Sequence, residues 1–425
     1  MPHTPRQHLN QVANVILAGG QGTRLYPLTQ FRCKPSVCFG GRYRLIDIPI
    51  SNSLNARVER IFIISQYFAS SLQQHIFETY QFDEFQQTPI HMLCPEKTSQ
   101  SKIWFKGTAD AIRQNRIHLE TSSAEYFLIL SGDQLYNIDF IEMLEFTKMQ
   151  KADLVIASLP VQEEEACRMG LLKINEKGQV VDFVEKPTDP NILKRYELSV
   201  SFLQGHFLAN PAKNHYLGSM GIYIFKRKAL LDLVNQEGDD FGKDLIPLCV
   251  KKGNIATYVY KGYWEDIGTI RAYYNANMAL LSQKKCLNIY DTHNPIFTHP
   301  HNLPSPLIKE SYIHNSIISQ GSIIEAKEVN GSIVGINIKI DQNTLVRNSI
   351  LLGSLFYESF PKDPYTVGKD CHLENTILDE GASVGNRVKL INKEQLQTFD
   401  GDGVFIRDGI IIVTSGTHVP DGFVL

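Results

Sequence analysis

Residues 14–25 read Asn-Val-Ile-Leu-Ala-Gly-Gly-Gln-Gly-Thr-Arg-Leu, and no other stretch of the chain indicates as much about its fold and function. The apolar run Val15–Leu17 is typical of a short buried strand. Three glycines, a hydroxyl and a cation follow it at once: Gly19, Gly20, Gly22, Thr23 and Arg24. Glycines after a strand let backbone N–H groups approach a polyphosphate, and an arginine adds charged hydrogen bonds to the same anion. The stretch therefore predicts a strand that leads into a phosphate-binding turn.

This turn matches neither of the common nucleotide-binding patterns. It lacks the Gly-x-x-x-x-Gly-Lys-Ser/Thr of a P-loop, and Gly-Gly-x-Gly-Thr-Arg differs from the Gly-x-Gly-x-x-Gly of dinucleotide-binding folds. A glycine-rich turn without a ligand is the structural alternative, because short motifs carry false positives.

Strand and helix patterns alternate from residue 12 to about residue 285. The expected strands are Val12–Ala18, Arg60–Ser65, Tyr126–Ser131, Leu154–Leu159, Val180–Glu185, Ser219–Phe225 and Ile255–Val259, and the expected helices include Ala69–Tyr80, Thr108–Leu119 and Phe140–Gln150. This alternation is typical of an α/β fold with a mostly parallel, Rossmann-like sheet and crossover helices. Such sheets bind ligands beyond the carboxyl ends of their strands, where the glycine turn would lie.

The pattern changes near residue 290, where helical periodicity ends. Four prolines fall within residues 291–306 and predict an extended linker: Pro295, Pro300, Pro304 and Pro306. We therefore predict an α/β domain over residues 1–290, a proline-rich linker over 291–306 and a different domain over 307–425.

A short signature repeats in this last domain. An asparagine, a serine, threonine or glycine and then an apolar pair recur around Ile317, Ile333, Ile350 and Ile377, which are spaced 16, 17 and 27 residues apart. Three hexapeptides make one coil of a parallel β-helix of about 18 residues, so the first two gaps fit a slightly shortened coil. The third gap predicts an inserted loop at Gly353–Tyr365. A β-sandwich is the alternative, but it does not predict the recurrence. Such a solenoid suits subunit contacts or regulation better than chemistry.

Composition excludes several classes of protein. The chain has 425 residues with 43% hydrophobic residues and a net charge of −3, so it has ample core and no basic excess for nucleic acid. No apolar run reaches the length of a membrane span, and too few residues precede the first strand for a signal peptide. The seven cysteines are scattered without a Cys-x-x-Cys, which favours a reducing cytoplasm.

Two carboxylates follow strands of the expected sheet. Asp133 comes after Tyr126–Ser131, and Asp266 lies in Trp-Glu-Asp-Ile-Gly-Thr after the strand near Val259. Each aspartate alone is more often a cap or turn residue, but a pair at one sheet edge suits Mg²⁺, which prefers oxygen ligands and substrate phosphates. We therefore expect a magnesium site at Asp133 and Asp266.

Other polar groups are suited to phosphate and sugar. Lys34 lies ten residues after Arg24 and is placed to neutralise a leaving diphosphate, while Glu185, Lys186 and Ser219 suit a sugar phosphate. A solvated lysine and an exposed salt bridge are the alternatives. Together the groups predict nucleotidyl transfer, in which a phosphate monoester is already a nucleophile. Positioning, charge neutralisation and Mg²⁺ then supply most of the rate, and none of the thirteen histidines falls in these motifs.

With these motifs the chain resembles the ADP-glucose pyrophosphorylase family from about residue 12 to the C-terminus. The most particular matches are Trp-Phe-Lys-Gly-Thr-Ala-Asp-Ala at residues 104–111 and Ser-Met-Gly-Ile-Tyr at residues 219–223. Further matches are Lys34-Pro35, residues 43–52, Ser65-Gln66-Tyr67, Gly132-Asp133, Glu185-Lys186-Pro187 and residues 264–269.

The resemblance implies a nucleotidyltransferase domain, then a left-handed parallel β-helix used for oligomerisation and regulation, usually in a homotetramer. It implies that ATP and glucose 1-phosphate give ADP-glucose and pyrophosphate with Mg²⁺, the first committed step of glycogen or starch synthesis. The resemblance implies four catalytic residues, Arg24, Lys34, Asp133 and Asp266, of which the two aspartates hold the metal. It implies these residues for ATP: Gly19, Gly20, Gly22, Thr23, Gln66, Gly107, Thr108 and Ala109. It implies these for glucose 1-phosphate: Phe105, Gly170, Glu185, Lys186 and Ser219.

Three other functions stay open. A nucleotidyltransferase for another base or sugar would share these motifs. An acyltransferase in the β-helix would need a histidine there, and only His314 and His372 lie within the repeats. A regulatory subunit without turnover is disfavoured because Arg24, Lys34 and both aspartates are present.

The chain departs from the family at four positions. Gln134 replaces a frequent histidine, which we interpret as tolerable. Members that respond to an anionic sugar-phosphate or phosphoglycerate effector often carry lysines where this chain has Phe31, Glu380 and Ser415. An anion needs cations, and these three residues supply none.

We therefore predict that fructose bisphosphate and phosphoglycerate stimulate this chain weakly or through another site. Initial rates measured across a titration of each effector test the prediction. Strong stimulation, with half-saturation like that of typical relatives, would contradict it.

Overall fold

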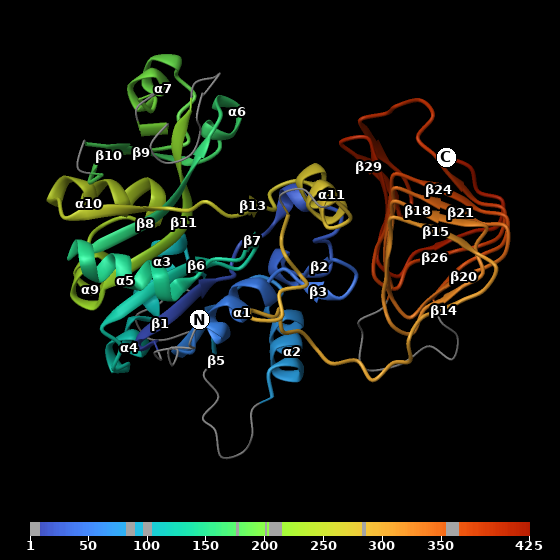
Figure 1. The fold of residues 1–425 in the computed structure, drawn as a ribbon, viewed down its shortest axis with the longest axis horizontal. Coiled ribbons are helices and arrows are strands. Elements are labelled where there is room, and N and C mark those ends of the chain that lie inside the picture. The colour runs from blue at the N-terminus through green and yellow to red at the C-terminus, as the bar shows by residue number, and fades with distance from the viewer. Residues whose placement is uncertain are drawn as a thin grey trace, which may run out of the picture.

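The computed structural model describes residues 9–81, 90–96, 104–175, 178–199, 202–203, 215–282, 286–353 and 365–425. The chain forms two parts, a layered α/β domain and a triangular β-helix that stands to one side of it (Figure 1). The predicted fold class is confirmed by this architecture.

The α/β domain is built on a sheet with nine strands among the described residues, in the order β10-β9-β11-β6-β1-β4-β5, with β8 and β12 beyond β11. The strands are β1 (Leu9–Leu17), β4 (Val58–Ile64), β5 (Ile90–Leu93), β6 (Tyr126–Ser131), β8 (Leu154–Val161), β9 (Gly170–Ile174), β10 (Val180–Glu185), β11 (Tyr216–Lys226) and β12 (Ile255–Val259). β1 pairs in parallel with β4 and β6, whereas β11 runs antiparallel to β6, β8 and β9. Only β10 and β11 oppose the common direction of these strands, so the sheet is mostly parallel.

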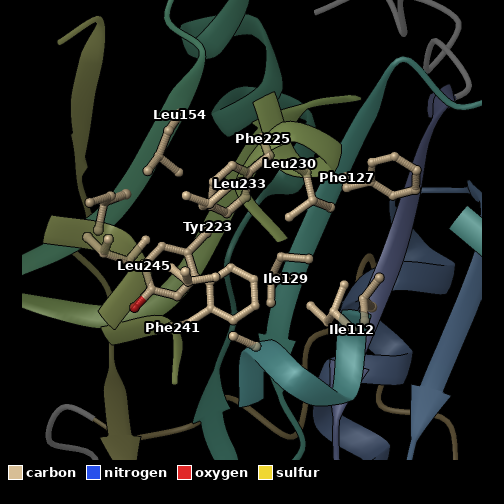
Figure 2. Packing of buried hydrophobic residues seen from close by; sticks show 14 of the residues in the cluster. Ile112, Phe127, Ile129, Leu154, Tyr223, Phe225, Leu230, Leu233, Phe241 and Leu245 are labelled. Carbon is tan, nitrogen blue, oxygen red and sulfur yellow. The ribbon is translucent and has the colours of Figure 1, made fainter. Parts of the chain in front are cut away.

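Helices cover both faces of this sheet because its central strands are apolar on both sides. On β1, Ala13 and Val15 join one hydrophobic cluster, and Val12 and Ile16 join the other. The first face is covered by α3 (Thr108–Gln114), α4 (Arg116–Thr121), α9 (Arg227–Val234) and α10 (Ile246–Lys252). The second face is covered by α1 (Asp47–Asn55), α2 (Ala69–Thr79) and α5 (Phe140–Gln150). Figure 2 shows the first cluster, where Phe127 and Ile129 of β6 face Leu230 and Leu233 of α9.

Most expected elements appear within a few residues of their expected limits, but one expected helix is divided. The stretch 108–119 forms α3 and α4, which meet at Asn115. The Asn115 side chain donates to the carbonyl of Ala111 at 2.9 Å and its backbone leaves helical geometry, so the helix restarts there. Propensity did not show this because each half alone has a helical composition.

Smaller elements complete this domain. They are η1 (Thr23–Leu25), η2 (Lys34–Ser36), η3 (Phe241–Leu245), α6 (Glu163–Ala166), α7 (Pro190–Tyr196), α11 (Ile270–Ala279), the hairpin of β2 (Cys38–Phe39) with β3 (Tyr43–Arg44), and the pair of β7 (Gln134–Tyr136) with β13 (Trp264–Asp266). None of the described helices is long and apolar enough to span a membrane. All seven cysteines lie among the described residues and carry free thiols.

The β-helix has three sheets, in the part of the chain that the structure describes. The first contains β14 (Leu307–Ile308), β17 (Ile323–Ile324), β20 (Ile338–Ile340), β23 (Tyr365–Val367), β26 (Ser383–Val384) and β31 (His418–Val419). The second contains β15 (Tyr312–His314), β18 (Glu328–Asn330), β21 (Leu345–Arg347), β24 (His372–Glu374) and β27 (Lys389–Leu390). The third contains β16 (Ile317–Ile318), β19 (Ile333–Ile336), β22 (Ile350–Gly353), β25 (Thr376–Leu378), β30 (Ile410–Val413), β29 (Val404–Arg407) and β28 (Thr398–Asp400).

The repeated isoleucines stack one above another in the third sheet. Ile317 pairs with Ile333, Ile333 with Ile350, and Ile350 with Ile377, all in parallel register. The preceding corners hold Asn315, Gly331, Asn348 and Asn375 at positive φ values of 43°, 57°, 45° and 49°. Asparagine and glycine tolerate this left-handed conformation, which explains why they recur in the signature. The repeat that predicted a β-helix is thus confirmed, while residues 354–364 of the expected loop lie outside the described residues.

The two domains share a hydrophobic cluster. Ile270 and Tyr273 of α11 pack in the same cluster as Ile336 and Ile350 of the β-helix. The chain between the domains runs along α1, where the Phe297 amide donates to the Ser51 hydroxyl at 2.8 Å. The interface is therefore an extension of both cores.

Leu233 tests the packing of α9 on the sheet. It is buried, so we expect Leu233→Ala to lower the free energy of unfolding by about 2–5 kcal/mol through lost burial and a residual cavity. Urea unfolding followed by circular dichroism measures this. Asp232→Ala, at an exposed position beside it, is the control and should change the free energy of unfolding by less than about 0.5 kcal/mol. Equal effects of the two variants would contradict the packing.

Candidate active site

A cavity of about 750 Å³ opens at the carboxyl ends of β1 and β6. Its size suits a small-molecule site. Fourteen of the predicted site residues line it: Gly19, Gly20, Arg24, Lys34, Gln66, Phe105, Gly107, Thr108, Asp133, Gly170, Glu185, Lys186, Ser219 and Asp266. Groups assigned from separate motifs are therefore neighbours in space.

Three predicted nucleotide-binding residues are not among the residues that line this cavity. Gly22 has a φ of 66°, and a Cβ there would lie 2.9 Å from Cβ of Lys34. Thr23 is exposed on η1. Ala109 is buried in α3, where its amide donates to the Asp239 carbonyl at 2.8 Å. Gly22 and Ala109 thus shape the walls of the cavity, because they let the glycine turn and α3 approach neighbouring segments closely.

The two aspartates meet because β7 pairs with β13. In this antiparallel ladder Asp266 lies opposite Gln134, the residue directly after Asp133. The Gln134 side chain accepts a hydrogen bond from the indole N–H of Trp264 at 3.4 Å, so it also links the two strands. The pairing brings together carboxylates that are far apart in the sequence.

Lys34 lies between the two carboxylates. Its Nζ is 2.5 Å from Oδ2 of Asp133 and 3.6 Å from Oδ1 of Asp266. Asp133 also accepts a hydrogen bond from the Ser131 hydroxyl. The arrangement is a compact cluster in which one cation serves two anions.

The electrostatics of this cluster follow from burial and proximity. Burial opposes the charged forms, but Lys34 outweighs it at Asp133 and lowers the pKa of that carboxyl. Burial and the negative charge of Asp133 raise the pKa of Asp266 above its usual value. The two carboxylates together outweigh burial at Lys34 and raise its pKa. A lysine held between two acids therefore stays protonated near neutral pH.

The opposite wall of the cavity holds Glu185. A Cβ on Gly170 would lie 2.8 Å from Oε2 of Glu185, and a Cβ on Gly242 would lie 2.7 Å from the same oxygen. Two glycines therefore leave the space that this carboxylate occupies. Its Oε1 lies 3.2 Å from Nζ of the exposed Lys186, and Ser219 lines the cavity nearby. This wall combines an acceptor, a cation and a hydroxyl.

Two further contacts lie where α3 begins. The Gln66 carboxamide accepts from the Phe105 amide at 2.7 Å and donates to the Phe105 carbonyl at 3.4 Å. The hydroxyl of Thr108 donates to Oδ2 of Asp240 at 3.1 Å. The start of α3 is thus fixed against η3, although Gln66 and Phe105 were assigned to different substrates.

The cavity lining also includes residues that the motifs did not single out as site residues. They are Tyr67, Glu165, Arg168, Met169, Tyr223, Asp240, Trp264, Glu265 and Thr269, among others. Some of them belong to stretches quoted for the resemblance although no role was assigned to them: Tyr67, Tyr223, Trp264, Glu265 and Thr269. The others gave no sequence signal of their own. In the described part of the chain no group of three or more His, Cys, Asp or Glu side chains is arranged to hold a metal ion.

Two family models match the chain. Residues 13–283 match the model described as nucleotidyl transferase. Residues 301–424 match the model described as the GLGC left-handed parallel β-helix domain. The first match covers the whole cavity described above, and the second covers the stacked coils.

Glu265 gives a pH test of this cavity. Burial and the nearby charges of Glu165 and Asp266 raise the pKa of Glu265 to about 7. Between its usual pKa of 4.5 and about 7, the folded state holds a proton that the unfolded state has released, so this group makes stability fall as pH rises. We compare the free energy of unfolding of Glu265→Gln with that of the wild type at each pH. After allowance for partial exposure, we expect the difference to favour the variant by about 1–2 kcal/mol more at pH 8 than at pH 5.

Urea unfolding of both proteins at the two pH values, in EDTA, measures the difference. Glu163→Gln removes an exposed carboxylate of α6 and is the control, with an equal effect at both pH values. A gain from Glu265→Gln that does not change with pH would contradict the raised pKa.

Proposed function

The chain belongs to the nucleotidyl transferase family and has the two-domain architecture of ADP-glucose pyrophosphorylases, and we propose that it transfers the adenylyl group of ATP to α-D-glucose 1-phosphate with release of pyrophosphate. The observation that carries the proposal is the cluster of Lys34, Asp133 and Asp266 beside the glycine turn, within one cavity.

The chemistry requires no protein nucleophile. A phosphate oxygen of glucose 1-phosphate forms a bond to the α-phosphorus of ATP, and the bond from that phosphorus to the bridging oxygen of the β-phosphate breaks. The electron pair leaves with pyrophosphate, and the attacking phosphate is already ionised near neutral pH. Catalysis of this kind consists of positioning and of neutralising the charge that develops.

The cations of the cavity suit this task. Arg24 and Lys34 both line it, and Arg24 lies close enough to affect the titration of Asp266 and Lys34. In the proposed reaction the backbone of Gly19 and Gly20 approaches the triphosphate, while the two cations neutralise the leaving pyrophosphate.

The donor set at Asp133 and Asp266 fits a magnesium ion. The carboxylates of Asp133 and Asp266 both lie beside the Lys34 ammonium, so they are close enough together to share a cation. Mg²⁺ is usually held by one or two carboxylates with substrate phosphates and water. When bound, such an ion neutralises phosphate charge and orients the reacting groups. Asp133 and Asp266 are therefore the residues that we propose as its ligands.

The second substrate suits the wall around Glu185. The carboxylate is a hydrogen-bond acceptor for sugar hydroxyls, Ser219 offers a hydroxyl, and Lys186 offers a charge to the sugar phosphate. Phe105 and Gly170 complete this side of the cavity.

The preference for adenine rests on the domain architecture, because nucleotidyl transferases for other bases share the phosphate machinery. With ADP-glucose as product, the chain acts in the cytoplasm at the first committed step of glycogen or starch synthesis. The β-helix is the element that we propose for assembly into a homotetramer.

Pyrophosphate release by the purified chain tests this function. With Mg²⁺ and glucose 1-phosphate, we expect release with ATP and little with UTP, GTP, CTP or dTTP. Asp133→Ala should lower kcat by at least about 100-fold, because a charge-stabilising group in the reacting centre is lost. Asp232→Ala, on α9 and away from the cavity, should retain wild-type activity.

The alternatives give distinct results. Release with another nucleotide would keep the reaction class and replace ATP. If the folded protein releases no pyrophosphate with any of the five nucleotides, the proposal is contradicted and a regulatory subunit without turnover is favoured.

A further inference from the structure

The turn that carries Lys34 is bound to the β-helix as well as to the active site. Lys34 begins η2, and Arg32 precedes it by two residues. Arg32 points away from the cavity lining and forms ion pairs with Asp379 and Glu380, which directly follow β25 of the β-helix. The short segment from Arg32 to Ser36 thus joins the site at Lys34 to the second domain at Arg32.

Glu380 bridges two arginines that flank this turn. Its Oε2 contacts Nη1 of Arg32, and its Oε1 lies 3.3 Å from Nη2 of Arg44. Arg44 also donates to the carbonyl of Ser36, the last residue of η2. Arg32 in turn donates to Oδ2 of Asp379 at 2.7 Å. One carboxylate of the β-helix therefore holds the turn from both of its ends.

Backbone hydrogen bonds make the turn stiff between these two points. The Ser36 amide donates to the Cys33 carbonyl at 3.0 Å, and the Ile46 amide donates to the Pro35 carbonyl at 3.0 Å. Since η2 is only three residues long, displacement of Arg32 or Ser36 must move Lys34 with it.

The cluster is buried and electrically balanced. Arg32, Arg44, Asp379 and Glu380 expose 5%, 8%, 1% and 1% of their surfaces, and two guanidinium groups face two carboxyl groups. Burial and the charge of Glu380 raise the pKa of Asp379. Burial raises the pKa of Glu380, but Arg44 and Arg32 outweigh it and bring that pKa below its usual value. Desolvating four charges is costly, and buried ion pairs are better attested as fixing geometry than as adding stability.

We propose that Glu380 is a positioning residue for nucleotidyl transfer: through Arg32 and Arg44 it holds the η2 turn so that the Lys34 ammonium lies between Asp133 and Asp266. The inference rests on the proposed function and assigns the β-helix an indirect part in the active site, because Glu380 acts through two arginines and does not line the cavity. Other contacts between the domains fasten the interface without touching this turn. One is the Tyr274 hydroxyl, which donates to the Asn348 carbonyl at 2.6 Å.

Steady-state kinetics of Glu380→Gln test the proposal, with Tyr274→Phe as the matched interface control. We expect Glu380→Gln to lower kcat by about tenfold or more with KM for glucose 1-phosphate within about threefold, and Tyr274→Phe to stay within about twofold of the wild type. In a Lys34→Met background, Glu380→Gln should lower kcat by less than about a further twofold, because the effect of Glu380 acts through the lysine. Arg44→Lys keeps the charge of the cluster, loses the fork that spans Ser36 and Glu380, and should show the same pattern if Glu380→Gln does not fold.

Hydrogen exchange of the segment 33–46 supplies a readout that needs no activity. We expect exchange there to be at least about tenfold faster in Glu380→Gln than in Tyr274→Phe. A wild type that is inactive with every nucleotide defeats the proposed function, and the exchange rates then still decide whether Glu380 holds the turn. If the wild type is active, two results would overturn the inference. One is a kcat of Glu380→Gln within about twofold of the wild type. The other is a double variant whose loss of kcat equals the product of the losses of Glu380→Gln and Lys34→Met.

Discussion

Two aspartates and one lysine at the edge of the sheet set the requirements that the surrounding structure meets. Asp133 and Asp266 carry like charges in a partly buried place, and a cation beside such a pair favours the ionised form of both carboxyl groups. Lys34 supplies that cation at 2.5 Å and 3.6 Å. The three residues come from separate parts of the chain, so the end of β6, the β7–β13 ladder and the η2 turn must all be fixed at once. A shift in any of them separates a charge from its partner, which is most costly for Lys34 and Asp133, the more buried of the three side chains.

Helix α11 joins these requirements to the second domain. It starts a few residues after Asp266, and its Tyr273 hydroxyl donates to the carbonyl of Cys38 in the β2–β3 hairpin at 2.6 Å. That hairpin ends in Arg44, which reaches Glu380 of the β-helix. The same helix contacts the β-helix directly through Tyr274. The interface and the active site are thus built from the same short segments, and the β-helix is a structural neighbour of the chemistry as well as a candidate surface for assembly.

Local patterns in the sequence predicted what local physics determines. Apolar runs marked the strands, and the isoleucine repeat predicted the β-helix because the same side chain stacks in every coil. The resemblance assigned seventeen site residues, and fourteen of them line the cavity. Neither could show that Glu185 fits between Gly170 and Gly242, or that Trp264 is held by Gln134, since those contacts depend on pairings between distant segments. The division of a helix at Asn115 was missed for a different reason, because it is a departure of one residue's backbone from helical geometry between two halves of helical composition.

Two of the positions that depart from the family, Glu380 and Ser415, also make contacts that the sequence alone did not show. Glu380 stands where related enzymes often have a lysine, and read alone it only removes a cation. In the fold it adds an anion beside Arg32 and Arg44, whose charges it neutralises. Ser415 donates its hydroxyl to the Glu380 backbone carbonyl at 2.8 Å, so this position also serves the same corner. An anionic effector approaching here would meet two arginines already paired and a buried carboxylate that repels it. Its binding would have to break the ion pairs of Glu380 with Arg32 and Arg44. Charge and geometry are therefore both reasons to expect weak activation at this corner.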